Sequence, residues 1–239
     1  MWLRLLVVVA AMVSSEACGR HHVGDKYVED VFTGSETIAL ANAACDGDAD
    51  EVAESVRRGA DVNVRGLWDM TPLFWALTCR SSRGVEALLA HGADVNAAMD
   101  NGWTPAIVAA TYDDPQFLRL VLRFGGDPSA ISQQADTSPL HMALRRGFET
   151  DDWTNYYILL EAGADVNRVY PLGDTIAEHA IVFGRFSKAL ELVVERGYTH
   201  DLAGLRRIAG GRLLAANSEE NPHRQRLIEE LDRRLAQGG

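Results

Sequence analysis

Histidine and cysteine side chains are the first candidates for chemistry in this chain of 239 residues, which contains 7 His and 3 Cys. His21 and His22 lie close enough to Cys18 to share a metal ion, but a flexible N-terminal segment would hold no fixed ligand geometry. The chain has no Gly-rich phosphate loop, no H-E-x-x-H, no G-x-S-x-G and no paired C-x-x-C. We therefore expect no catalytic residue, no metal site and no cofactor, and we expect a binding function.

A pattern that recurs about every 33 residues organises the rest of the chain. The sequence Gly-Ala-Asp-Val-Asn occurs at 59–63, 92–96 and 163–167. Alanines of the segments between these motifs recur at spacings of 33, 33, 34 and 37 residues, at Ala43, Ala76, Ala109, Ala143 and Ala180. A fixed period near 33 predicts a stack of repeats in which each unit buries its apolar face against its neighbours.

Each period contains signals for two short helices. Thr71 is suited to cap the first helix, and Pro72 then occupies the first helical position, where its missing N–H costs nothing. Val85, Leu88 and Leu89 have the apolar spacing of the second helix. The glycines that follow the second helices are expected to end them in the left-handed conformation, at Gly59, Gly92, Gly125 and Gly163.

These motifs resemble the ankyrin repeat family over residues 35–201, and Ser138-Pro139-Leu140-His141-Met142-Ala143 is close to its full motif. The resemblance implies an all-α ankyrin repeat solenoid of about five helix-pair units with finger hairpins. It also implies a structural role for His141 and for His179. Outside the repeats, we expect a signal peptide over 1–17, an N-terminal tether over 18–34 and a C-terminal helical cap over 202–239.

The later repeats are irregular. Four extra residues are expected between the two helices of unit four, around 149–154. Unit five, over 168–201, departs from the pattern at both ends. Beyond it we expect a helix from Leu202 to Ala216 and a last helix that starts at Asn221-Pro222, with Leu227 and Leu231 on its apolar side.

Ankyrin proteins bind partners with their fingers and with the concave face of their first helices. The resemblance therefore implies contacts just before each Thr-Pro and just after each helix alanine. The predicted surface is centred on Trp68, Trp103 and Tyr112, with Asp69, Asp100 and Asp174 adding negative charge. The predicted partner-binding residues are Trp68, Met70, Asp100, Trp103, Tyr112, Arg145, Arg146, Trp153, Tyr170 and Phe183.

Two of these aromatic residues have alternatives. Trp103 either contacts a partner or packs along its own finger, as a Trp before Thr-Pro does in many ankyrins. Trp153 either contacts a partner or folds back to fill the widened gap between the helices of unit four. The sequence leaves both questions open.

The N-terminal residues have the pattern of an export signal. Arg4 precedes an apolar core from Leu5 to Val13, which is too short to span a bilayer. The segment that ends at Cys18 also resembles a bacterial lipobox, so we expect Cys18 to receive lipid and to tether the protein to the outer membrane from the periplasm. The alternative is ordinary cleavage after Ala17.

The two remaining cysteines, Cys45 and Cys79, occupy similar places in neighbouring units. Stacked helices lie roughly 8–10 Å apart, whereas a disulfide needs Cα atoms within about 7 Å. We therefore expect free, partly buried thiols.

The net charge of −11 disfavours a nucleic-acid partner and favours a protein with a basic surface patch. The leader, the opening at 38–48 and the segment at 69–77 resemble bacterial periplasmic ankyrin proteins, some of which are type VI secretion immunity proteins that block lipase effectors. The resemblance implies a monomer that binds such a toxin, with membrane contact only through the lipid anchor. The alternative is a periplasmic scaffold or stress-protection protein that binds a resident enzyme.

Overall fold

The computed structural model describes residues 22–23, 26–211 and 219–237, so the predicted signal peptide and Cys18 lie outside the described residues. The chain divides into two compact units, Met1–Asp127 and Pro128–Gly239, and each is considered by itself. Both units are built from helices, with only a two-stranded hairpin and isolated bridges as β structure in the part that is described. No helix among these residues is long and apolar enough to cross a membrane.

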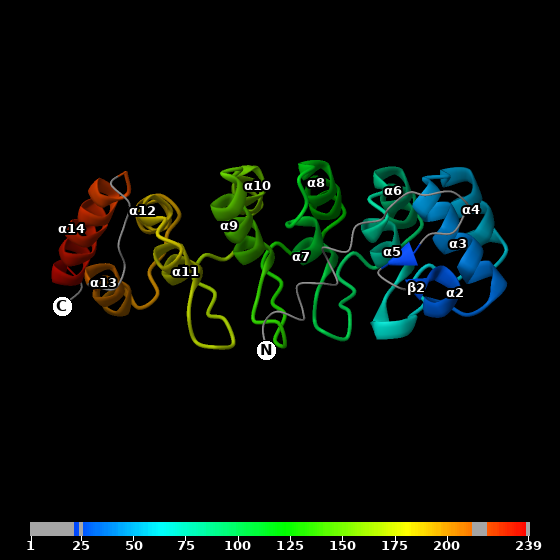
Figure 1. The fold of residues 1–239 in the computed structure, drawn as a ribbon, viewed down its shortest axis with the longest axis horizontal. Coiled ribbons are helices and arrows are strands. Elements are labelled where there is room, and N and C mark those ends of the chain that lie inside the picture. Colours follow the sequence, from blue (N-terminus) through cyan, green and yellow to red (C-terminus); the bar gives the residue numbers. More distant parts are fainter. Residues whose placement is uncertain (1–21, 24–25, 212–218, 238–239) are drawn as a thin grey trace. The chain divides into compact units, whose positions relative to one another are not determined.

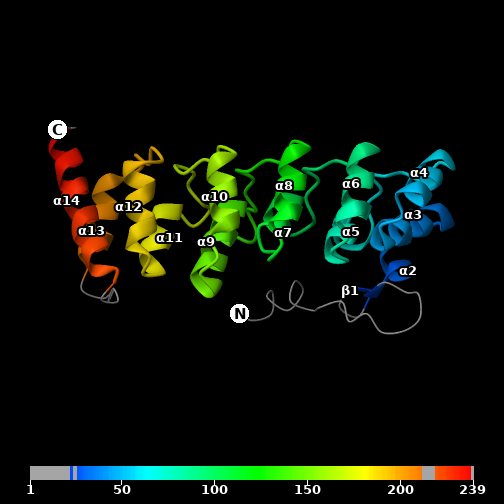
Figure 2. The same cartoon turned by 90° about the horizontal axis from the view of Figure 1, so that it is seen from above.

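Unit 1 begins with a short hairpin and continues as helix pairs joined by long loops (Figure 1). Its elements are β1 (His22–Val23), β2 (Lys26–Tyr27), α2 (Val28–Val31), α3 (Ser35–Asp46), α4 (Ala49–Arg57), the 3-10 turn η1 (Leu67–Asp69), α5 (Pro72–Thr78), α6 (Ser82–Ala90), α7 (Pro105–Ala109) and α8 (Pro115–Arg123). The view from above shows α5 beside α6 and α7 beside α8 (Figure 2). In Figure 1 the loops before α5 and α7 project from the same side of the unit.

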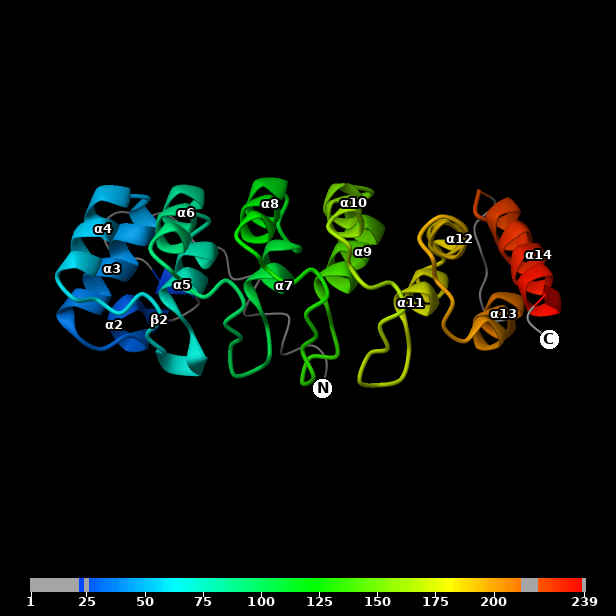
Figure 3. The same cartoon turned by 180° about the vertical axis from the view of Figure 1, so that it is seen from behind.

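Unit 2 contains two further helix pairs and two terminal helices. Its elements are α9 (Pro139–Thr150), α10 (Thr154–Glu161), α11 (Ile176–Val182), α12 (Phe186–Val194), α13 (Leu202–Gly210) and α14 (Asn221–Gln237). α14 packs against α12 and α13, as Figure 3 shows from behind. Leu227 and Leu231 are fully buried in this contact, while most of the helix faces solvent.

The helix ends form as the sequence predicts. A hydroxyl caps the first helix of the second to fifth repeats by accepting an N–H bond in its first turn, at Thr71, Thr104, Ser138 and Thr175. The glycines after the second helices have positive φ, with values of 98° at Gly59 and 83° at Gly163. The N–H of the next residue then bonds back to the helix, because this left-handed turn reverses the chain.

Asparagine side chains connect consecutive repeats. In unit 1 the Asn96 amide donates to the Gly125 carbonyl at 3.0 Å and accepts from the Asp127 N–H at 2.8 Å. Asn63 makes the same two bonds, to the Gly92 carbonyl and the Asp94 N–H. The last residue of each Gly-Ala-Asp-Val-Asn motif therefore holds the equivalent turn of the next repeat.

Residues 28–32 correct the predicted tether. Val28 and Phe32 are buried, and the Phe32 ring meets the Trp75 ring edge-on at 6.0 Å. The sequence prediction assigned residues 18–34 to a tether, but Val28, Val31 and Phe32 are buried, so that α2 packs onto the first repeat.

The extra residues of the fourth repeat, around 149–154, also lie differently from the prediction. They lengthen the first helix, so that α9 has 12 residues where α5 has 7, instead of forming a loop between two helices of ordinary length. Asp151 then ends α9 in the left-handed conformation, with φ of 59°.

The prediction of free thiols at Cys45 and Cys79 is wrong, because the two residues form a disulfide with their Cα atoms 5.3 Å apart. The separation of roughly 8–10 Å applies to helix axes, whereas Cα atoms lie about 2.3 Å from the axis. On facing sides of α3 and α5 the Cα atoms are correspondingly closer than the helix axes. Cys45 lies in the last turn of α3, and Cys79 directly follows α5.

We expect the disulfide to stabilise unit 1 by about 3–4 kcal/mol, because it closes a loop of 34 residues. The double variant Cys45→Ser/Cys79→Ser should unfold at lower urea concentration than the parent chain under oxidising conditions. With dithiothreitol the two proteins should unfold together. A parent chain that is insensitive to the reductant would contradict this prediction.

Removing the amide of Asn96 should lower the free energy of unfolding by about 1–2 kcal/mol, because it leaves one carbonyl and one N–H without a partner. Asn96→Asp keeps the acceptor but loses the donor, so its loss should be smaller than that of Asn96→Ala. Gln116→Ala, at an exposed position on α8, is the control. Urea denaturation measures all three, and equal stabilities would refute the connecting role.

Candidate functional site

The finger that precedes α5 presents two neighbouring exposed apolar side chains. Leu67 is 41% and Trp68 37% exposed, and both belong to the 3-10 turn η1. The exposed carboxylates of Asp69 and Asp100 lie beside them, since the Asp100 N–H donates to the Trp68 carbonyl at 3.1 Å. We call Leu67, Trp68, Asp69 and Asp100 the finger surface.

The backbone of the finger surface is strained. Trp68 and Asp69 both have positive φ, of 60° and 56°. A non-glycine residue in this conformation costs roughly 1–2 kcal/mol, so surrounding contacts must hold it. The Gly66 N–H donates to the Met70 carbonyl at 2.8 Å, and the Arg65 guanidinium donates to the carbonyls of Asp69 and Ala98. These bonds close the finger tip and keep the indole of Trp68 outside.

Three predicted contact residues are buried, which corrects the prediction that they face a partner. Met70, Tyr112 and Tyr170 each expose no more than 4% of their surface. The Tyr112 hydroxyl donates to the Leu77 carbonyl at 2.7 Å, and the Tyr170 hydroxyl bonds with that of Ser138 at 2.7 Å. Because α7 has only five residues, Tyr112 follows its end and turns inward against the neighbouring repeat. Burial raises the pKa of Tyr112 to about 12.

Trp103 is partly buried and takes part in its own finger. Its backbone N–H donates to the side-chain oxygen of Asn101 at 3.0 Å, and its carbonyl accepts from the Met99 N–H at 2.9 Å. The indole nitrogen is buried. Of the two alternatives from the sequence, the structure favours packing along the finger.

In unit 2 the lengthened α9 carries an exposed aromatic residue that the sequence analysis missed. Phe148 is 43% exposed and stacks on Phe183, with ring centroids 5.3 Å apart. Val182, in the last turn of α11, is 61% exposed. We call Phe148, Val182 and Phe183 the aromatic patch. The four extra residues near 149–154 are the sequence signal for an exposed Phe148. They predict its exposure only if they are assigned to the first helix and not to a loop.

Trp153 folds back onto its own unit. A Cβ on Gly147 would lie 2.4 Å from the Trp153 ring, so only glycine lets the indole cover α9. The ring also packs edge-on against the Tyr156 ring. The Arg185 guanidinium and the Lys188 ammonium lie over it, 5.6 and 4.6 Å from the ring centroid. The structure therefore favours the folded-back alternative for Trp153.

The two predicted arginines are paired within α9 and the turn after it. Arg145 donates to Glu149 at 2.9 Å. Arg146, whose side chain is largely buried, donates to Asp152 at 3.4 Å. Their charges are therefore already balanced locally. Among the predicted contact residues, Trp68 and Asp100 are exposed and Phe183 is partly exposed.

Two histidines pack against each other inside unit 2. The rings of His141 and His179 lie 4.1 Å apart, and the second bonds Asp174 at 2.8 Å through its Nε2 atom. Burial, and to a smaller extent the neighbouring His179, lowers the pKa of His141 to about 3, although Asp174 opposes this. A structural role for both histidines, which the family resemblance implies, is consistent with this packing.

The stability of unit 2 should therefore fall as the pH falls below 6.5. The unfolded chain takes up a proton on His141 near pH 6.5, while the folded chain does so only near pH 3, so acid favours the unfolded state. From pH 6.5 to 5.0 the loss should reach about 2 kcal/mol. His179, Asp136, Asp174 and Arg145 face the same cluster.

Urea denaturation at both pH values measures this effect. His141→Gln should lose less stability on acidification than the parent chain. An identical pH dependence in the two proteins would refute the prediction.

Comparison with known proteins identifies the repeats. Residues 40–131 match the family model described as ankyrin repeats (3 copies). The chain is 33% identical over 144 residues to Protein PhlB of Serratia liquefaciens, covering 60% of this chain and 61% of that protein. It is 29% identical over 101 residues to the putative ankyrin repeat protein FPV024 of fowlpox virus, covering 42% and 16%. Human ankyrin repeat and SOCS box protein 16 is 28% identical over 114 residues, covering 48% and 25%. The chain thus spans less than two thirds of each of these relatives.

Proposed function

This chain is an ankyrin-repeat protein, and we propose that it acts as an exported immunity protein that binds and blocks a toxic secreted enzyme of the lipase type. Ankyrin repeats are protein-binding elements, and this part of the proposal follows from the family. Export, the toxin and the inhibition are the further steps. The observation that supports the proposal is the finger surface, a strained tip on which the side chains of Leu67 and Trp68 are exposed.

The chemistry of the finger surface supports a partner with a basic surface patch. Leu67 and Trp68 offer apolar area, and Trp is among the residues that dominate binding energy at interfaces. The carboxylates of Asp69 and Asp100 lie next to this area and can pair with Lys or Arg of the partner. The net charge of −11 would speed the encounter of such a pair.

The disulfide supports export. Disulfides persist in oxidising compartments such as the bacterial periplasm and are rare in the cytosol. The Cys45–Cys79 bond therefore fits the leader-like residues 1–17. It also engages two of the chain's three cysteines, so that Cys18 is the one left for the lipidation proposed above.

Inhibition by such a protein would be steric and stoichiometric. The finger surface would cover the toxin's active site or hold its lid, and no bond would be made or broken. The relatives named above share the repeats with this chain, but family membership does not specify the partner.

Affinity capture followed by an activity assay tests the proposal. Residues 19–239, tagged at the C-terminus, would be exposed to periplasmic and secreted fractions. A secreted lipase that is retained in equimolar amount and loses its activity on titration with the chain is the expected result. A captured enzyme that stays fully active would overturn the immunity proposal and favour the periplasmic scaffold.

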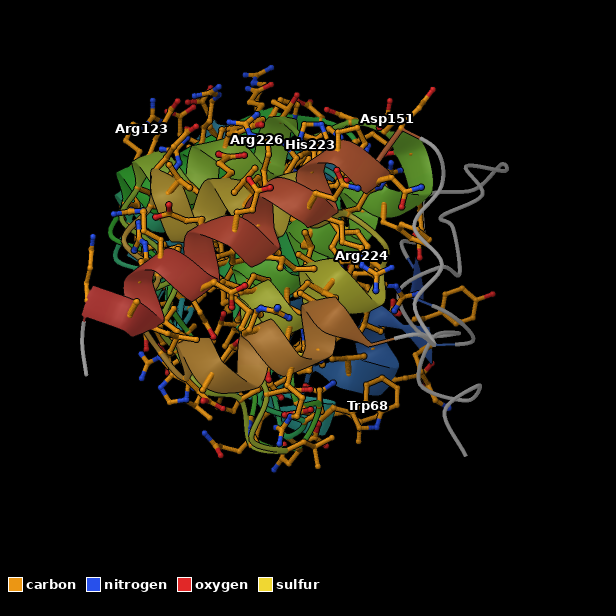
Figure 4. The ribbon with its side chains drawn as sticks, turned by 90° about the vertical axis from the view of Figure 1, so that its left-hand side faces the viewer. Trp68, Arg123, Asp151, His223, Arg224 and Arg226 are labelled. Atoms are coloured by element: carbon orange, nitrogen blue, oxygen red, sulfur yellow. A yellow bond between two sulfur atoms is a disulfide. The ribbon has the colours of Figure 1, made fainter. Side chains whose placement is uncertain are left out.

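Trp68→Ala should weaken binding of that partner by about 2 kcal/mol or more, roughly 30-fold, if the finger surface makes the central contact. Phe124→Ala is a matched control, since Phe124 is also 37% exposed but follows α8. Its neighbour Arg123 lies on the side of unit 1 opposite to Trp68 in Figure 4. Equal affinities of the two variants, measured by calorimetry, would place the contact elsewhere.

A further inference from the structure

Unit 2 contains a surface cavity of about 400 Å³ that none of the features described so far explains. It is formed by α10, α12, the residues after α12, and the start of α14. The aromatic patch lies on α9, α11 and the residue after α11, so the cavity is a different surface. We call it the α12–α14 cavity.

The cavity has a charged base that is already compensated. Glu191 accepts from Arg196 at 3.2 Å with one oxygen, and with the other from the Tyr157 hydroxyl at 3.3 Å and from Lys188 at 3.5 Å. The side chains of Lys188 and Glu191 are each only 13% exposed. Two cations therefore surround one carboxylate, and the base keeps an excess of positive charge.

Two further basic side chains line the rim. His223 and Arg226 project from the same side of α14, one turn apart, while Arg224 points the other way (Figure 4). Arg224 donates to the Ala209 and Gly211 carbonyls. In the described part of the chain, neither the His223 nor the Arg226 side chain makes a hydrogen bond or an ion pair.

The negative charges near the cavity differ in how they are engaged. Glu220 is buried and accepts from both the N–H and the hydroxyl of Ser187, each at 2.8 Å, so it is held at the start of α12. The carboxylate of Glu195 is exposed on the rim and makes no hydrogen bond or ion pair among the described residues. It is the one carboxylate of the lining that an entering anion would meet unpaired. Leu190 and the half-exposed Val194 supply an apolar wall.

We propose that the α12–α14 cavity binds the acidic headgroup of a small amphiphile, a carboxylate or phosphate monoester on an alkyl chain. The headgroup lies between His223 and Arg226, above the excess charge of Lys188 and Arg196. Arginine can donate two parallel bonds to such a group. The alkyl chain covers Val194. This assignment is independent of the proposed immunity function.

Calorimetry of the full chain with octyl phosphate tests the proposal. Saturable binding is expected, and Arg226→Ala or His223→Ala should weaken it at least tenfold. Glu195→Gln should strengthen it several-fold, because it removes the unpaired carboxylate. Arg233→Ala, on α14 but bonded to Glu230, is the matched control and should leave the affinity unchanged. Circular dichroism confirms that each variant is folded.

Comparison probes separate the possible results. Inorganic phosphate that binds as tightly as octyl phosphate would overturn the amphiphile assignment, and octylamine that binds equally well would overturn the acidic headgroup. An unchanged affinity of Arg226→Ala would overturn the site. Vesicles of phosphatidylglycerol bound with the same dependence on Arg226 would support the proposal with a membrane lipid as the source. Octyl phosphate binding without vesicle binding would support it with a free amphiphile.

Discussion

In three of the repeats, one asparagine amide sets the position of the turn in the repeat that follows. Asn63 and Asn96 in unit 1, and Asn167 in unit 2, each donate to the carbonyl of a helix-ending glycine and accept an N–H two residues beyond it. An aspartate would lack the donor, and a glutamine would place the amide one carbon farther out. The long loops of each unit depend on these bonds, because few other backbone bonds join one finger to the next.

Buried tyrosine hydroxyls fix the same spacing from the inside. Tyr112 bonds a carbonyl at the end of α5, and Tyr170 and Tyr198 bond the hydroxyls of Ser138 and Thr175, which cap the first helices of unit 2. Each hydroxyl is satisfied, so the ring contributes its apolar area without the cost of an unpaired polar group. Aromatic side chains at these positions therefore join repeats and do not recruit partners.

The sequence predicts the frame of this protein well and its surface less well. Helix caps, glycine turns and apolar stripes are local signals, so the ankyrin units and the α14 cap follow directly from them. Exposure depends on contacts between segments distant in sequence, and for this reason Tyr112 and Tyr170 were assigned to the surface although both are buried. The disulfide was missed because Cys45 and Cys79 were judged by the distance between helix axes. Phe148 was missed because an insertion can lengthen a helix or a loop, and periodicity does not distinguish the two.

Two of the exposed aromatic residues, Trp68 and Phe148, lie where the repeat pattern is broken. Trp68 and Asp69 occupy left-handed conformations that an ordinary finger would give to glycine, and Phe148 exists outside the packed core only because α9 runs past its usual end. Local departures of this kind carry a cost in stability, and proteins retain them mainly at functional sites. The repeats supply a rigid frame that many sequences can build, so the family specifies the fold. Recognition of one partner must then depend on the few positions where this chain differs from the pattern.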